Sequence, residues 1–96
     1  MDTMFAIAYD FDTDVMKAHL GEASYTNGYT KFKDFMRKRG FTGQQRSLLY
    51  GAPWISSVDA CRAIQDATNH FPWLKDAARD MRLLEVAHND DLTVLL

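Results

Sequence analysis

The sequence predicts an α+β fold, a ferredoxin-like βαββαβ sandwich in which residues 1–96 form a single domain. A chain of 96 residues is long enough to bury one hydrophobic core. Residues 4–10 form an apolar run of strand length, and apolar residues recur twice further along with the period of a helix. Strand-like segments separate and follow these helices. The resulting order of strand, helix, strand, strand, helix, strand is that of the split βαβ arrangement.

The first strand predicts a second copy of the chain as a partner. Because side chains alternate along a strand, the bulky residues Phe5, Ile7 and Tyr9 share one face, and the small residues Ala6 and Ala8 share the other. Two helices cover only one face of a four-stranded sheet. We therefore expect a face-to-face homodimer about a twofold axis, with Ala6 and Ala8 in the interface.

The first helix is predicted over residues 24–39. One face of this helix carries the aromatic and apolar residues Tyr25, Tyr29, Phe32 and Met36. Ser24 is the expected N-cap, because its hydroxyl can accept a hydrogen bond from the first free backbone amides. Gly40 is the expected left-handed residue that ends the helix.

The second half of the chain is predicted as a hairpin over residues 41–50, a helix from Ser56 or Ser57 to residue 69, and a strand over residues 79–87. The inward stripe of this helix is expected to be Val58, Cys61, Ile64, Thr68 and Phe71. Pro72 ends the helix or begins a short extra turn, with Trp73 as an anchor against the sheet. The apolar tail of residues 92–96 is expected to add a strand to a sheet.

Charge and cysteine content limit the possible functions. The net charge of −2 does not fit a generally basic nucleic-acid binder, but residues 31–46 contain six basic residues against one acidic residue, and such a patch attracts phosphates. Cys61 is the only cysteine, so no internal disulfide forms, and it is expected as a small buried residue. The N-terminal apolar run is too short for a signal peptide or a membrane span, so we expect a cytoplasmic protein without a membrane partner.

Three aspartates at alternate positions, Asp10, Asp12 and Asp14, resemble the start of a calcium-binding loop. That loop requires glycine at its sixth position and glutamate at its twelfth, where this chain has Val15 and Gly21. A calcium loop is therefore excluded. The spacing of cysteine and histidine supports no zinc site either.

Six short motifs in register indicate a family. They are the strand ending in Ala8-Tyr9-Asp10, Gly40-Phe41, Gln45-x-Ser47, Phe71-Pro72-Trp73, Arg79-Asp80-Met81-Arg82 and Asp90-Asp91-Leu92-Thr93. In this order they resemble the virulence-associated protein D (VapD) family, which is similar in fold to the small endonuclease-like subunit of CRISPR adaptation complexes. The resemblance implies a dimeric ferredoxin-like endoribonuclease, in several members the toxin of a toxin–antitoxin pair. RNA, a second copy and a protein antitoxin are thus the expected partners.

The same resemblance implies a catalytic role for Asp10 and Ser47. Asp10 would draw a proton from a hydroxyl or a water molecule, or would bind a divalent metal such as Mg²⁺. The alternatives are that Asp10 is a loop-entry or N-cap residue and that Ser47 only closes the hairpin. Two residues depart from the family pattern: Arg46 stands where glycine is usual and Leu49 where an aromatic residue is common.

The expected RNA-binding residues are basic. A guanidinium matches the geometry of a phosphate, so the candidates for phosphate contact are Arg46, Arg82, Arg37, Lys38 and Arg39. For Arg82 a salt bridge with Asp80 is an equally good explanation. Two other functions stay open: a non-catalytic scaffold of the CRISPR-adaptation kind that binds duplex DNA, and a toxin-type protein that binds RNA or an antitoxin without turnover.

Overall fold

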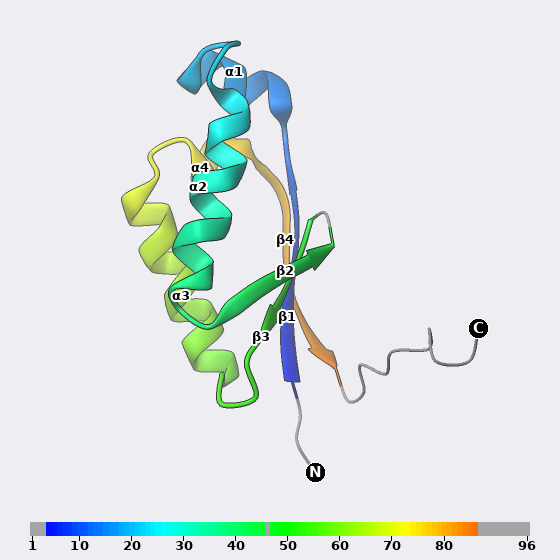
Figure 1. Ribbon diagram of the computed structural model, residues 1–96. Coiled ribbons are helices and arrows are strands. Elements are labelled where there is room, and N and C mark those ends of the chain that lie inside the picture. The colour runs from blue at the N-terminus through cyan, green and yellow to red at the C-terminus, as the bar shows by residue number, and fades with distance from the viewer. Residues whose placement is uncertain (1–3, 46, 87–96) are drawn as a thin grey trace, which may run out of the picture.

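The computed structural model describes residues 4–45 and 47–86 as a two-layer α+β protein. Figure 1 shows one sheet with the helices on one of its faces. The strands are β1 (Met4–Phe11), β2 (Phe41–Gln45), β3 (Leu48–Gly51) and β4 (Ala78–Val86), in the order β2-β3-β1-β4 with each neighbouring pair antiparallel. The predicted order of strands and helices and the α+β class are confirmed, and the sheet is compatible with a ferredoxin-like fold.

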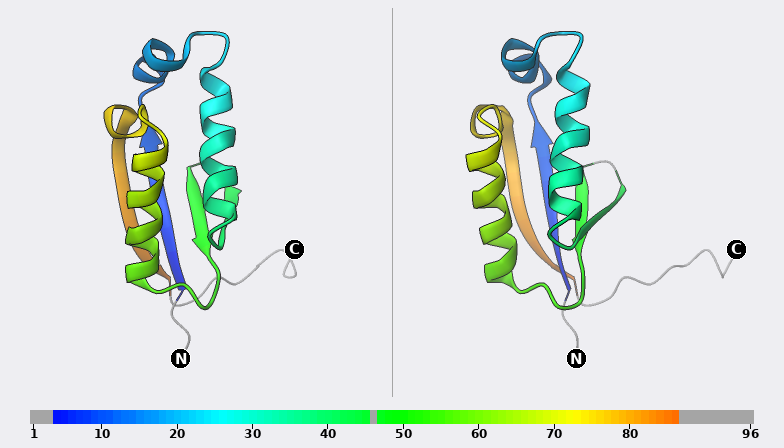
Figure 2. Two further views of the ribbon diagram at one scale, coloured as in Figure 1. Left: turned by 90° about the vertical axis from the view of Figure 1, so that its left-hand side faces the viewer. Right: turned by 60° about the vertical axis from the view of Figure 1, so that its left-hand side comes forward.

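Within the described residues, four helices form the second layer: α1 (Thr13–Leu20), α2 (Tyr25–Arg37), α3 (Ser57–His70) and α4 (Leu74–Ala77). Figure 2 shows α2 and α3 side by side in front of the strands. The predicted helices and hairpin are present with end shifts of a few residues. The short turn expected after Pro72 is α4. None of the helices in the described part of the chain is long and apolar enough to cross a membrane.

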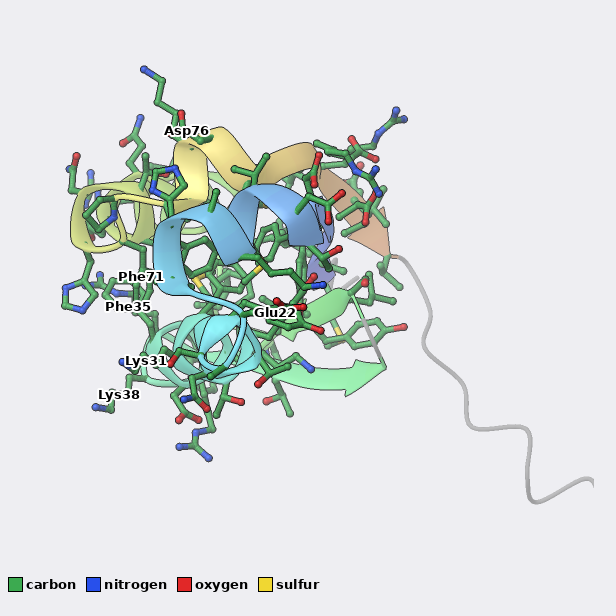
Figure 3. All side chains as sticks on the ribbon, turned by 90° about the horizontal axis from the view of Figure 1, so that it is seen from above. Glu22, Lys31, Phe35, Lys38, Phe71 and Asp76 are labelled. Carbon is green, nitrogen blue, oxygen red and sulfur yellow. The ribbon has the colours of Figure 1, made fainter. Side chains whose placement is uncertain are left out.

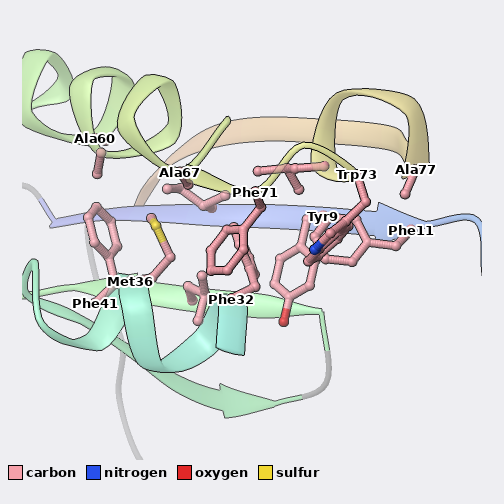
Figure 4. Close-up of a cluster of buried hydrophobic side chains, with 14 of the residues drawn as sticks. Tyr9, Phe11, Phe32, Met36, Phe41, Ala60, Ala67, Phe71, Trp73 and Ala77 are labelled. Atoms are coloured by element: carbon pink, nitrogen blue, oxygen red, sulfur yellow. The ribbon is translucent and has the colours of Figure 1, made fainter. Parts of the chain in front are cut away.

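The alternation predicted for the strands places the core correctly. Tyr9 is opposite Met81 and Ile7 is opposite Leu83, and this face of the sheet meets the helices. Phe32 and Met36 of α2 are fully buried against it. Figure 4 shows how these side chains interleave between the strands and helices. The core is therefore filled mainly by large residues from the sheet and α2.

The helix α1 was not predicted, and it gives Asp12, one of the three alternate aspartates, a structural role. Asp12 is its N-cap, because the Asp12 carboxylate accepts hydrogen bonds from the backbone amides of Asp14 (2.9 Å) and Val15 (3.2 Å). α1 packs closely on α2 at Gly28, where an added Cβ would meet Leu20 at 2.7 Å. The glycine inside α2 is thus explained by this close approach of two helices.

Ser24 occupies the N-cap position of α2 as predicted, but the side-chain hydrogen bond expected of it is absent. The Ser24 backbone is already helical, with φ −119° and ψ −5°, and its side chain makes no capping hydrogen bond. Its amide and that of Tyr25 instead donate to the Gly21 carbonyl oxygen, so the turn after α1 leads directly into α2. The predicted end of α2 is confirmed, since Gly40 has φ +96°.

The predicted inward stripe of α3 is confirmed at Ile64 and Phe71, which lie against or in the core, and wrong at Val58 and Cys61. The buried residues of α3 are Ala60, Ala63 and Ala67, whereas Val58 is 62% exposed and Cys61 is exposed. Small alanine side chains let α3 lie close to a core that is filled mainly by large side chains of the sheet and α2. Ser56 caps α3 as expected, in a capping box with Asp59.

Candidate functional site

A cavity opens where β1 continues past the end of β3. β3 pairs with β1 only from Ala6 to Ala8, and one further backbone bond joins the Tyr9 N–H to the Ser47 carbonyl oxygen at 3.0 Å. Figure 1 shows the arrowhead of β2 well below the upper end of β1. The cavity has a volume of about 580 Å³. The cavity is lined by the end of β1, the start of α1, one face of α2, the hairpin and the start of β4. The lining residues are Tyr9, Asp10, Phe11, Asp12, Thr13, Asp14, Tyr25, Thr26, Tyr29, Lys33, Ser47 and Arg79.

Asp10 and Arg79 form an ion pair in the lining of this cavity. A guanidinium nitrogen of Arg79 donates to the Asp10 carboxylate at 2.9 Å, and the two side chains are 60% and 56% exposed. An ion pair this exposed contributes only about 0–1 kcal/mol, because water competes for both groups. Both groups are therefore available to a charged ligand that enters the cavity.

A second ion pair lies across the strand from Asp10. Asp80 is directly opposite Asp10 in the β1–β4 register, and Arg82 donates to both Asp80 oxygens at 2.9 and 3.1 Å. Like charges directly opposite each other destabilise a sheet, and each carboxylate here has its own arginine. The hydrogen bonds to Asp80 raise the pKa of Arg82. Arg82 thus has the salt bridge that was the alternative to a phosphate contact, and it does not line the cavity.

The hydroxyl of Tyr9 is the unusual polar group of the site. Tyr9 is 4% exposed, and its hydroxyl oxygen is buried without a hydrogen-bond partner among the described residues. Burial, and to a smaller extent Tyr29, raises the pKa of this hydroxyl. Its ring is held by Phe11 and Phe32, with centroids 4.9 and 5.1 Å away, and Figure 4 shows the hydroxyl pointing away from β1. The group is therefore a fixed, protonated hydroxyl on a residue of the cavity lining.

The α2 side of the cavity is aromatic and basic. Tyr25, Tyr29 and Lys33 recur at every fourth residue and so share one face of the helix. The ammonium group of Lys17 lies over the Tyr25 ring at 4.9 Å, and the Tyr29 ring packs against Phe11 at 5.5 Å. Lys33 makes no ion pair with any residue between 4–45 and 47–86. This wall offers rings to stack on and a cation.

Ser47 reaches the cavity from the hairpin turn. Its backbone has φ +70°, a left-handed conformation that is unfavourable for a residue with a side chain. Arg46, predicted to contact phosphate, lies outside the described residues, as does the apolar tail 92–96. The structure thus brings Asp10 and Ser47 to one cavity, and their catalytic role stays a prediction.

The basic residues at the end of α2 are not part of the cavity. Arg37 pairs with Asp34 at 3.2 Å, and Arg39 pairs with Asp66 at 2.7 Å. They lie at the opposite end of α2 from Tyr25, about 20 Å along a helix of 13 residues. Figure 3 shows Lys38 projecting from α2 away from the sheet. RNA contact by Arg37, Lys38 and Arg39 remains a prediction, but at a different place from Asp10.

The described residues provide few ligands for a metal ion. No three or more histidine, cysteine or acidic side chains gather at one point in the part of the chain that the structure describes. Asp12 is engaged as the N-cap of α1. The donors of the described residues therefore suit at most an ion held by Asp10 together with substrate oxygens and water, as Mg²⁺ often is.

Sequence reasoning missed Arg79 and the wall formed by Tyr25, Tyr29 and Lys33. The strand order of the predicted fold held a signal for Arg79, because β4 lies beside β1 and the start of one faces the end of the other. The two tyrosines were predicted as core residues. They are half-buried instead, each contacting the core with one part and the cavity with another.

Together the fold and the cavity define a small α+β sandwich protein with a carboxylate–guanidinium pair beside the end of its central strand. No protein-family model matches the chain. A protein of Riemerella anatipestifer, Endoribonuclease VapD 2, is 32% identical over 89 residues, which are 93% of this chain and 95% of that protein. Endoribonuclease VapD homolog of Helicobacter pylori is 28% identical over 89 residues, 93% and 92% of the two chains. Endoribonuclease VapD of Dichelobacter nodosus is 29% identical over 93 residues, 97% of each. The chain belongs to the VapD family, which confirms the resemblance found in its motifs.

Proposed function

We propose that this protein is an endoribonuclease whose active site is the cavity beside Asp10. The observation that carries the proposal is the exposed Asp10–Arg79 pair in the cavity lining, in a chain whose relatives are named endoribonucleases. Cleavage of a phosphodiester requires a base and a cation, and this pair supplies one of each. The weak, exposed ion pair lets Arg79 exchange the carboxylate for a phosphate when RNA binds.

In the proposed reaction the Asp10 carboxylate accepts a proton from a ribose 2′-hydroxyl or from a water molecule. The oxygen so activated bonds to phosphorus, the bond from phosphorus to the leaving oxygen breaks, and the leaving oxygen takes a proton from water. Arg79 and Lys33 offset the negative charge that grows on the phosphoryl oxygens. A 2′,3′-cyclic phosphate at the product end would identify the 2′-hydroxyl as the nucleophile. Any divalent ion would be held by Asp10 and would activate the attacking water.

The proposal includes a homodimer formed by the sheet face that has no helices. The register places Met4, Ala8, Leu48, Tyr50, Leu84 and Val86 on this face. Ala6 belongs to the same face but is fully buried within one chain, so it has no surface to offer a partner. This corrects the expectation for Ala6: its neighbours Tyr50 and Leu84 cover it and would make the contact instead. A role as a toxin with a cognate antitoxin is proposed from the family resemblance alone.

The test is cleavage of RNA by the wild type and by Asp10→Asn and Arg79→Ala, each with and without EDTA. Removing a general base typically lowers the rate 10²- to 10⁴-fold, and that loss is expected for Asp10→Asn. Arg79→Lys should retain more activity than Arg79→Ala, since it keeps a cation. Asp34→Ala breaks an exposed ion pair with Arg37 at the far end of α2 and is the matched control. Equal cleavage by the wild type and Asp10→Asn would disprove the assignment.

A further inference from the structure

We propose that the cavity beside Asp10 is also a subsite for one unstacked nucleobase of single-stranded RNA, bound against Tyr25 and recognised by the Tyr9 hydroxyl. The proposal rests on the proposed function, because it makes the cavity part of the RNA site, and it adds the side chains that hold and select a base. The cavity volume of about 580 Å³ lies within the range of pockets that enclose small ligands.

The α2 wall has the composition of a base-stacking platform. Proteins that bind single-stranded RNA stack unpaired bases on aromatic rings and hold the backbone with nearby cations. Here Tyr25 and Lys33 lie two turns apart on the same face of α2, and both line the cavity. A base stacked on the ring and a phosphate beside Lys33 would occupy the same groove.

The Tyr25 ring is fixed in position before any ligand binds. Lys17 of α1 lies over it at 4.9 Å, and a cation at this distance from a ring attracts it. α1 itself is held against α2 by the glycine at position 28. The platform is therefore preorganised, which lowers the entropy lost when a base binds.

The Tyr9 hydroxyl supplies the polar contact that such a subsite needs. It is buried, has no partner among the described residues, and is carried by a residue of the cavity lining. A buried hydroxyl without a partner is unfavourable, and a native protein that keeps one calls for an explanation. A hydrogen bond to the edge of a base would satisfy it and would favour some bases over others. The groove between α3 and β4 is mostly apolar, and none of its lining residues carries a buried hydroxyl without a partner.

The experiment measures binding of a short single-stranded RNA to protein that carries Asp10→Asn, so that cleavage is slow, and gel electrophoresis of the RNA after each measurement checks that it is intact. An abasic ribose is placed at each position of the RNA in turn, and fluorescence anisotropy gives Kd for each. At one position, loss of the base should weaken binding about tenfold, the usual scale for one stacked base. Tyr25→Ala should weaken binding of the intact RNA by a similar factor and leave the matching abasic RNA unaffected. Tyr25→Phe, which keeps the ring, should bind as the wild-type residue does.

Two further variants complete the test. Tyr9→Phe should retain affinity within a few-fold but lose the preference among the four bases at that position. Trp54→Ala removes an aromatic ring that is 75% exposed and outside the cavity, so it should leave Kd unchanged for both the intact and the abasic RNA. Equal weakening of intact and abasic RNA by Tyr25→Ala, or no weakening at all, would overturn the subsite. This result is independent of the cleavage assay, so a failure of the subsite and a failure of the nuclease are distinguished.

Discussion

Replacing Tyr9 by phenylalanine should stabilise the protein, which is unusual for a change at a fully packed position. The substitution keeps the ring between Phe11 and Phe32 and removes only the buried oxygen. A hydroxyl buried without a hydrogen bond costs about 1–3 kcal/mol in proteins. Taking the lower end, we expect the free energy of unfolding to rise by about 1 kcal/mol. For a chain of this size that is a rise in Tm of roughly 4–8 °C.

The same variant should change the dependence of stability on alkaline pH. Burial raises the pKa of Tyr9 above the ordinary tyrosine value of 10.0, so the folded state holds this proton more tightly than the unfolded state does. Stability from this group is complete below pH 10.0 and falls as the pH rises through the unfolded and then the folded pKa. Tyr9→Phe should remove that part of the alkaline loss. Thermal unfolding by circular dichroism at several pH values, at one fixed protein concentration, measures both effects.

A second tyrosine supplies the control for Tyr9→Phe. Tyr50 is half-buried on the sheet face without helices, and Tyr50→Phe removes a hydroxyl outside the cavity. A lower Tm for Tyr9→Phe than for the wild type would refute the reasoning. It would show that the hydroxyl is hydrogen-bonded within the protein, and the polar contact assigned to the nucleobase subsite would then have to come from elsewhere.

Two other substitutions test the dimer and the start of α3. Ala8→Glu should convert the dimer to a monomer in analytical ultracentrifugation, because a charge would be buried in an apolar interface. Val58→Glu, on the exposed side of α3, should leave the dimer intact. A monomeric wild type would contradict the proposed dimer. At Asp59, the hydrogen bonds from the Ser56 backbone amide and then its side chain lower the pKa. Asp59→Ala should therefore lower Tm at neutral pH, and the difference should vanish as the pH falls below 3.8; a constant difference would contradict this.

The strands could be predicted from the sequence because their period is unambiguous. The faces predicted for the first strand are those observed, with Ile7 and Tyr9 toward the helices. A period of two leaves only two choices of face, and one of them is plainly richer in large apolar residues.

The helices were harder because alanine carries little hydrophobic signal. In α3 the apolar stripe read from the sequence included Val58 and Cys61, but the fold buries Ala60, Ala63 and Ala67. Small side chains are needed on this face of α3 because large side chains of the sheet and α2 already fill the core. The helix α1 was missed because its eight residues are mostly polar and its only buried residue is Met16.

The site was predicted where it depends on one segment and missed where it depends on two. Asp10 and Ser47 came from motifs within single segments. Arg79 reaches Asp10 only because β4 pairs with β1, 69 positions away along the chain. The basic cluster at residues 37–39 looked suitable by charge alone, but charge does not show that this end of α2 lies away from Asp10.

Two local costs meet at the cavity, and this supports a functional site on grounds separate from family membership. Tyr9 keeps a buried hydroxyl without a partner, and Ser47 holds a left-handed backbone that glycine would adopt without strain. The backbone bond from the Tyr9 N–H to the Ser47 carbonyl oxygen joins these two residues directly. Selection for stability alone would favour phenylalanine at the first position and glycine at the second. Strained or unsatisfied groups persist where a function requires them, and here both of them line the cavity that contains Asp10 and Arg79.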